Sequence, residues 1–133
     1  GRHRAALMLL DTRVLLWLLT EPDRLGPTTS QRLRSAPRVL VSAVSIAELQ
    51  IKAMLGKLEL PAGFEERLTT MGLEQLALTH THAIAIDRLP ELTRHDPFDR
   101  LLLAQASVDG TTFLTADGRL LALGLSFVAD ATN

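Results

Sequence analysis

Short apolar runs alternate along this chain with segments that have helical spacing, and this alternation is the strongest constraint on the fold. Strands that alternate with helices predict a parallel sheet covered by helices on both faces. Strands are predicted over residues 6–10, 38–41, 73–78, 112–114 and 126–128. Helices are predicted over residues 12–20, 27–35, 42–55, 62–71, 79–86, 96–109 and 117–123. The expected fold class is therefore α/β, with three α/β/α layers and a central, mainly parallel sheet of four to five strands.

The bulk composition fits a single domain of this kind. The chain has 133 residues, which is enough to bury a real core, and its low aromatic content of 4% argues against a many-stranded all-β fold. Asp11 and Arg13 interrupt the longest apolar run, so neither a membrane span nor a signal peptide is expected. The absence of cysteine excludes disulfides and thiolate metal sites. We expect one cytoplasmic domain over residues 1–133, with residues 1–6 as an extension before the first strand.

Four acidic residues lie near junctions between a predicted strand and the helix that follows it. Asp11 and Asp117 end predicted strands, and Glu48 and Asp99 lie near the starts of predicted helices. Because these strand ends and helix starts lie along one edge of a parallel sheet, all four carboxylates can point into one cleft. Carboxylate oxygens are the ligands that a hard divalent cation prefers, and a cation held in this way can hydrolyse a phosphodiester. The pattern predicts a metal-dependent nuclease.

Each acid also has an ordinary structural explanation. Asp11 and Asp117 are good helix caps, and Ser45 stands at capping-box spacing before Glu48, although Ser42 is an equally good start. Asp96, Pro97 and Asp99 are typical of a helix beginning. The occurrence of all four acids together favours a metal site. Two like charges about 5 Å apart at an effective dielectric of ~20 repel each other by about 3 kcal/mol. A cation or a shared proton has to offset that repulsion.

At these residues the chain resembles the PIN domain, and within it the VapC-type toxins of bacterial and archaeal toxin–antitoxin systems. The stretches that carry the resemblance, in the family's order, are LLDT with LLW after it, VSAVSIAEL, DPFDR running into LAQA, and LTAD. The resemblance implies a three-layer α/β/α fold, an endoribonuclease that depends on Mg²⁺ or Mn²⁺, an antitoxin partner encoded alongside, and a homodimer. One departure is Arg13, where close members often carry histidine.

The resemblance places the family's acidic motif on the same four residues, with Asp96 as a fifth. The residues predicted to bind the metal and carry catalysis are Asp11, Glu48, Asp99 and Asp117. Mg²⁺ keeps several waters, so some of these acids are expected to act through water, with Asp117 or Asp99 orienting or deprotonating the attacking one. The residues predicted to support the carboxylates, with helix capping as the alternative, are Thr12, Ser45, Asp96 and Thr115.

The net charge of −1 shows no strongly basic footprint, so contacts with RNA would depend on local basic residues and the metal. The residues predicted to make them, with surface solvation as the alternative, are Arg13, Lys52, Arg94 and Arg100. Arg100 can instead pair with the acid beside it. His80 and His82 do not share a helix face, which predicts surface or capping roles.

Two other functions stay open at this point. A PIN-like fold without catalysis can serve as a module for binding another protein, although four intact acids speak against it. A magnesium-dependent phosphatase of similar topology typically needs a second aspartate two residues after the first. The run Asp11-Thr12-Arg13 lacks that second aspartate.

Overall fold

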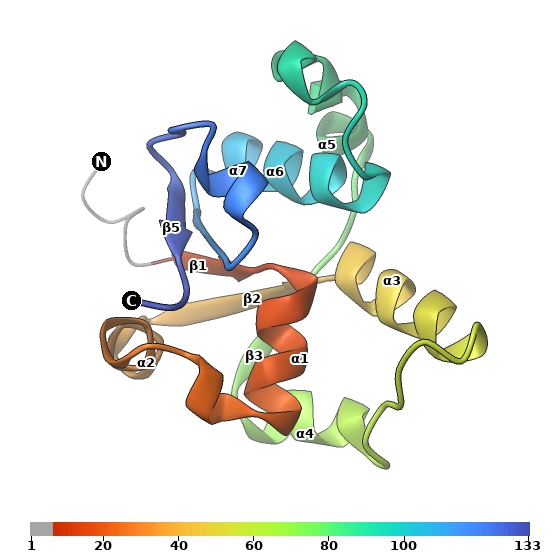
Figure 1. Cartoon of the computed structure of the whole chain (residues 1–133), viewed down its shortest axis with the longest axis vertical. Coiled ribbons are helices and arrows are strands. Elements are labelled where there is room, and N and C mark those ends of the chain that lie inside the picture. Colours follow the sequence, from red (N-terminus) through yellow and green to blue (C-terminus); the bar gives the residue numbers. More distant parts are fainter. Residues whose placement is uncertain (1–6) are drawn as a thin grey trace.

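The computed structural model describes residues 7–133 and contains one five-stranded sheet in the order β3-β2-β1-β4-β5 (Figure 1). Every neighbouring pair of strands is parallel. The strands are β1 (Leu7–Leu10), β2 (Arg38–Ser42), β3 (Leu73–Leu76), β4 (Thr112–Thr115) and β5 (Val128–Asp130). The expected α/β fold with a parallel central sheet is confirmed.

Helices follow the strands and cover the sheet in two layers. Figure 1 shows α5, α6 and α7 on one side of the sheet and α1, α2 and α4 on the other. The α-helices are α1 (Thr12–Thr20), α2 (Pro27–Ser35), α3 (Ala43–Met54), α4 (Phe64–Thr70), α5 (His80–Ile84), α6 (Pro97–Asp109) and α7 (Gly118–Leu121). Three short 3₁₀ turns join them, η2 (Pro22–Arg24), η3 (Ala85–Arg88) and η4 (Pro90–Leu92). Among residues 7–133 no helix has the length and apolar character needed to cross a membrane.

The core is divided by the sheet into two apolar clusters. In β1 the side chains of Met8 and Leu10 enter one cluster and that of Leu9 enters the other, as the two-residue period of a strand requires. The first cluster joins the sheet to α1 and α4, and the second joins it to α6 and α7. Burial on both faces explains why the inner strands are continuous apolar runs.

The ends of several elements differ from the sequence prediction. β5 starts at Val128 and not at Ser126, because the Val128 N–H donates to the Leu125 carbonyl and closes a turn across these residues. β3 ends at Leu76, and the predicted helix over residues 79–86 divides into α5 and η3. α4 begins only after Gly63, whose φ of 71° lies in the left-handed region. The predicted extension over residues 1–6 lies outside the described residues.

The carboxyl ends of the inner strands meet at one edge of the sheet, and this edge positions the acids. β1 runs directly into Asp11 and α1, β2 runs into α3, and β4 is followed by Asp117 and α7. The start of α6 reaches the same region although no strand precedes it directly. It is held there by its packing against α3 and α5.

Candidate metal centre

Asp11 is the most firmly held of the four acids. It caps α1, and its side chain is only 6% exposed. The Thr12 N–H donates to Oδ1 at 2.7 Å, and the Thr115 hydroxyl donates to Oδ2 at 2.6 Å. Burial raises the pKa of Asp11, the hydrogen bonds from Thr115 and Thr12 lower it, and the charges of Glu48 and Asp117 raise it further. A buried carboxylate with a raised pKa is costly to ionise, and a neighbouring positive charge would lower that cost.

Thr115 links two of the acids through one hydroxyl group. While Oγ1 donates to Asp11, it also accepts the Asp117 N–H at 3.0 Å. Asp117 in turn caps α7, where its Oδ1 accepts the Arg119 N–H at 2.8 Å. β4 therefore sets the relative position of Asp11 and Asp117, which are far apart in the chain. Thr115 therefore forms a hydrogen bond to the Asp11 carboxylate, which is the contact predicted from the sequence.

Glu48 lies on α3 and is 6% exposed. Its Oε2 accepts from the Lys52 ammonium at 2.6 Å. Its Oε1 is buried and has no hydrogen-bond partner among the described residues. A buried carboxylate oxygen without a donor costs free energy, so this oxygen favours a cation or a water molecule beside it.

Asp99 lies in the first turn of α6, after the cap formed by Asp96. The Asp96 side chain accepts the Phe98 N–H at 2.8 Å, so the capping explanation holds for Asp96. The pKa of Asp99 is raised to about 7 by burial and then by the charges of Asp11, Asp96, Glu48 and Asp117. The charges of these four acids therefore all act on the Asp99 carboxyl.

The hydroxyls of Thr12 and Ser45 contact each other and not the predicted carboxylates, although the Thr12 backbone N–H does donate to Asp11. The Thr12 hydroxyl donates to the Ser45 hydroxyl at 3.0 Å, which ties α1 to α3, and no carboxylate accepts from either hydroxyl in the part of the chain that the structure describes. Ser42, and not Ser45, caps α3 by accepting the Val44 N–H at 3.0 Å. These two hydroxyls therefore hold together the helices that carry Asp11 and Glu48.

The basic residues predicted to meet RNA differ in their surroundings. Arg13 and Arg94 are exposed. Arg100 donates through Nη1 to the Thr93 carbonyl at 3.2 Å, and no ion pair between it and Asp99 is found within residues 7–133. Lys52 is engaged by Glu48. Arg13 and Arg94 thus keep their charges free to face solvent.

His82 has a role that the sequence analysis only half anticipated. It completes a capping box with Thr79, but it is buried and not on the surface. Its Nε2 lies 3.1 Å from Asp109 of α6, and Gln105 of the same helix accepts from the Ser42 hydroxyl at 2.5 Å. The threonine three residues before His82 signalled the cap, whereas its burial depends on α6. This network fixes α6, and with it Asp99, against β2 and α5.

The donor set suits a hard divalent cation, because every ligand atom on offer is a carboxylate oxygen. Within residues 7–133, however, no three acidic or histidine side chains lie close enough together to hold a metal ion. The unpartnered Glu48 oxygen and the raised pKa values of Asp11 and Asp99 are features that a cation beside these carboxylates would compensate.

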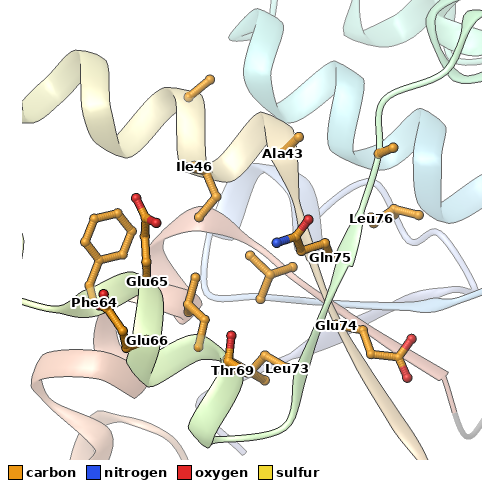
Figure 2. Close-up of a pocket in the computed structure, with 14 residues that line it drawn as sticks. Ala43, Ile46, Phe64, Glu65, Glu66, Thr69, Leu73, Glu74, Gln75 and Leu76 are labelled. Carbon is orange, nitrogen blue, oxygen red and sulfur yellow. The ribbon is translucent and has the colours of Figure 1, made fainter.

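A separate groove of 770 Å³ lies between α3, α4 and β3 (Figure 2). Its lining combines apolar side chains, such as Ile46 and Leu73, with the acids Glu65 and Glu66 of α4. Figure 2 shows Ile46 reaching into the groove from α3. None of the four predicted catalytic acids lines it, but α3 borders it and also carries Glu48.

The PIN domain family model matches residues 8–124. Ribonuclease VapC22 of Mycobacterium tuberculosis is 31% identical over 115 residues, which cover 85% of this chain and 88% of that protein.

Solved structures share the fold. The structure of VapBC2 from Rickettsia felis, bound to a promoter DNA fragment, matches with a TM-score of 0.70 at 16% identity, over 93% of this chain and 98% of that one. DNA-bound VapBC from Salmonella typhimurium matches with a TM-score of 0.65 at 20% identity, over 92% and 96% of the two chains. These matches show the fold, and the family model and the sequence relative show that the chain belongs to the PIN domain family, as a VapC-type member.

Proposed function

We propose that this protein is an Mg²⁺- or Mn²⁺-dependent endoribonuclease and the toxin of a toxin–antitoxin pair. The observation that carries the proposal is the electrostatic coupling of the acids: burial, and then the charges of neighbouring acids, raise the pKa values of Asp11 and Asp99. The relative from M. tuberculosis is named a ribonuclease. Because both proteins belong to the PIN domain family, cleavage of RNA is the activity that we propose for this protein. A non-catalytic binding module would have no use for this repulsive cluster.

The acids divide the work according to their surroundings. Asp11, Asp99 and Glu48 would hold the metal, and Asp11 is the fixed point because two donors orient it. A bound divalent cation supplies Lewis acidity toward a phosphate oxygen and a water ligand of lowered pKa. Asp117 or Asp99, which are both less buried than Asp11 and Glu48, would accept a proton from the attacking water. Arg13 and Arg94 are free to contact neighbouring phosphates.

Substrate class is tested by incubating the purified protein with Mn²⁺ and either RNA or single-stranded DNA of the same sequence. We expect cleavage of the RNA alone. The inactive reference is Asp11→Asn, and the matched control is Asp23→Asn, which removes an exposed acid from η2. If wild type leaves both nucleic acids intact under conditions where it binds Mn²⁺, the binding module becomes the better description.

The proposed partner is an antitoxin encoded beside this protein. The structural neighbours include a toxin–antitoxin complex from Klebsiella pneumoniae, with a TM-score of 0.64 at 18% identity over 92% of this chain and 95% of that one. We propose that an antitoxin segment lies in the groove of Figure 2 and places an arginine against the carboxylate cluster. A guanidinium is a permanent cation with a bidentate match to carboxylates, so it competes with the metal. A homodimer would cover the exposed side chains of Met54 and Leu55 at the end of α3.

Competition predicts that the cluster contributes to antitoxin affinity. The double variant Asp11→Asn/Asp99→Asn should bind the antitoxin at least about tenfold more weakly than wild type, because each lost charge-assisted contact is worth ~1.5–3 kcal/mol. Excess Mg²⁺ should weaken binding to wild type and not to the variant. Calorimetry measures both effects, and light scattering of the free toxin measures the dimer. Equal affinities, with no effect of Mg²⁺, would remove the competition model.

A further inference from the structure

Among residues 7–133, Lys52 forms the shortest ion pair with any of the four acids. It lies one helical turn beyond Glu48 on α3, and its Nζ is 2.6 Å from Glu48 Oε2. The lysine side chain is 42% exposed, whereas the glutamate side chain is 7% exposed. The lysine side chain is therefore accessible to solvent, whereas the carboxylate that it pairs with is buried.

The other acids have no comparable ionic partner among residues 7–133. Asp11 accepts only from neutral donors, the Thr12 N–H and the Thr115 hydroxyl. Arg119 approaches Asp117 no closer than 3.9 Å and is itself 80% exposed, so this contact is weak. Glu48 alone is neutralised by a side chain of its own helix.

A divalent cation would compete with Lys52 for the same carboxylate. Glu48 Oε1 is the buried oxygen without a partner, and Oε2 is held by the ammonium. A metal ion bound to this carboxylate would lie within a few ångströms of Nζ, and the two cations would repel each other. The exposed, flexible lysine can move out to water, whereas the metal cannot leave without losing its ligands.

We propose that Lys52 is a positioning residue that acts through Glu48 as its internal counter-cation, and that a divalent ion has to displace it. The inference rests on the proposed metal-dependent function and deepens it. In the metal-free protein Lys52 holds the buried carboxylate in place and offsets part of the cluster's repulsion. After displacement, the Lys52 ammonium would face solvent and could contact the phosphates of RNA.

The test compares Mn²⁺ affinity in the metal-free wild type, Lys52→Gln and Lys52→Arg by calorimetry and by electron paramagnetic resonance. Lys52→Gln should bind Mn²⁺ roughly fivefold more tightly, since a pair worth about 1 kcal/mol no longer competes. Lys52→Arg should stay near wild type. The matched control is Lys57→Gln, which removes the same charge from an exposed residue that forms no ion pair with residues 7–133.

A second background separates an effect through Glu48 from a general effect of charge. In Glu48→Gln, the further change Lys52→Gln should alter Mn²⁺ affinity by less than about twofold, because the pair is already absent. Nitrogen NMR of the lysine side chains in wild type should show the Lys52 signal shifting when Mg²⁺ is added. Unchanged or weaker Mn²⁺ binding by Lys52→Gln overturns the inference alone. Failure of every variant and of wild type to bind Mn²⁺ overturns the proposed function as well.

Discussion

Removal of divalent cations is expected to stop RNA cleavage almost completely. The carboxylates can position water, but without a cation they place negative charge against a phosphodiester, which is also negative. In the proposed mechanism a bound metal would supply several kcal/mol of transition-state stabilisation, so excess EDTA should lower the cleavage rate by more than about a hundredfold. The measurement is the rate of cleavage of a labelled RNA in EDTA, followed by re-addition of Mg²⁺ or Mn²⁺ in excess.

Recovery on re-addition distinguishes loss of the metal from loss of the fold. Far-ultraviolet circular dichroism in EDTA should be unchanged, because the hydrophobic clusters on both sides of the sheet involve none of the acids. Cleavage that continues at the full rate in the chelator would exclude the proposed mechanism. It would point to catalysis by side chains alone.

Asp99→Asn is expected to abolish cleavage and, in the metal-free protein, to stabilise the fold. Asp99 has a pKa raised to about 7 in the folded protein, from an ordinary value of 3.8. Between these two pH values the folded state binds more protons than the unfolded chain, so the free energy of unfolding falls as pH rises through this window. Above pH 7 the full penalty remains. Asparagine cannot ionise, so the variant avoids this penalty.

The expected gain is modest, because solvent screens a partly exposed carboxylate. At pH 8 without metal, Asp99→Asn should unfold about 5 °C above wild type, which corresponds to about 1–2 kcal/mol, and the difference should vanish near pH 4. Saturating Mg²⁺ should stabilise wild type and not the variant. Asp87→Asn, an exposed acid in η3, is the matched control and should show neither change. A lower melting temperature for Asp99→Asn at pH 8 would mean that Asp99 mainly stabilises the start of α6.

The positions of most secondary-structure elements could be predicted because their signals are local. Apolar runs buried on both faces, proline at the starts of α2 and α6, and Asp11, Asp96 and Asp117 as caps all act within one or two turns of chain. The gathering of the acids followed from the same signals, since a parallel sheet brings its strand ends to one edge. Where local signals are weak, as in the turn before β5, the prediction missed the start by two residues.

Only the tertiary structure decided how the acids are paired and which polar groups are buried. The hydroxyl of Thr115 reaches Asp11 across 104 positions of sequence, and His82 meets Asp109 across 27, so no local pattern specifies either contact. The sequence predicted Lys52 as a contact to RNA, whereas the structure pairs it with Glu48. Sequence determined which residue types stand at the ends of strands and starts of helices, because backbone preferences extend over a few residues. Packing between distant elements decided which of these side chains are buried. Burial in turn determines how strongly their charges interact.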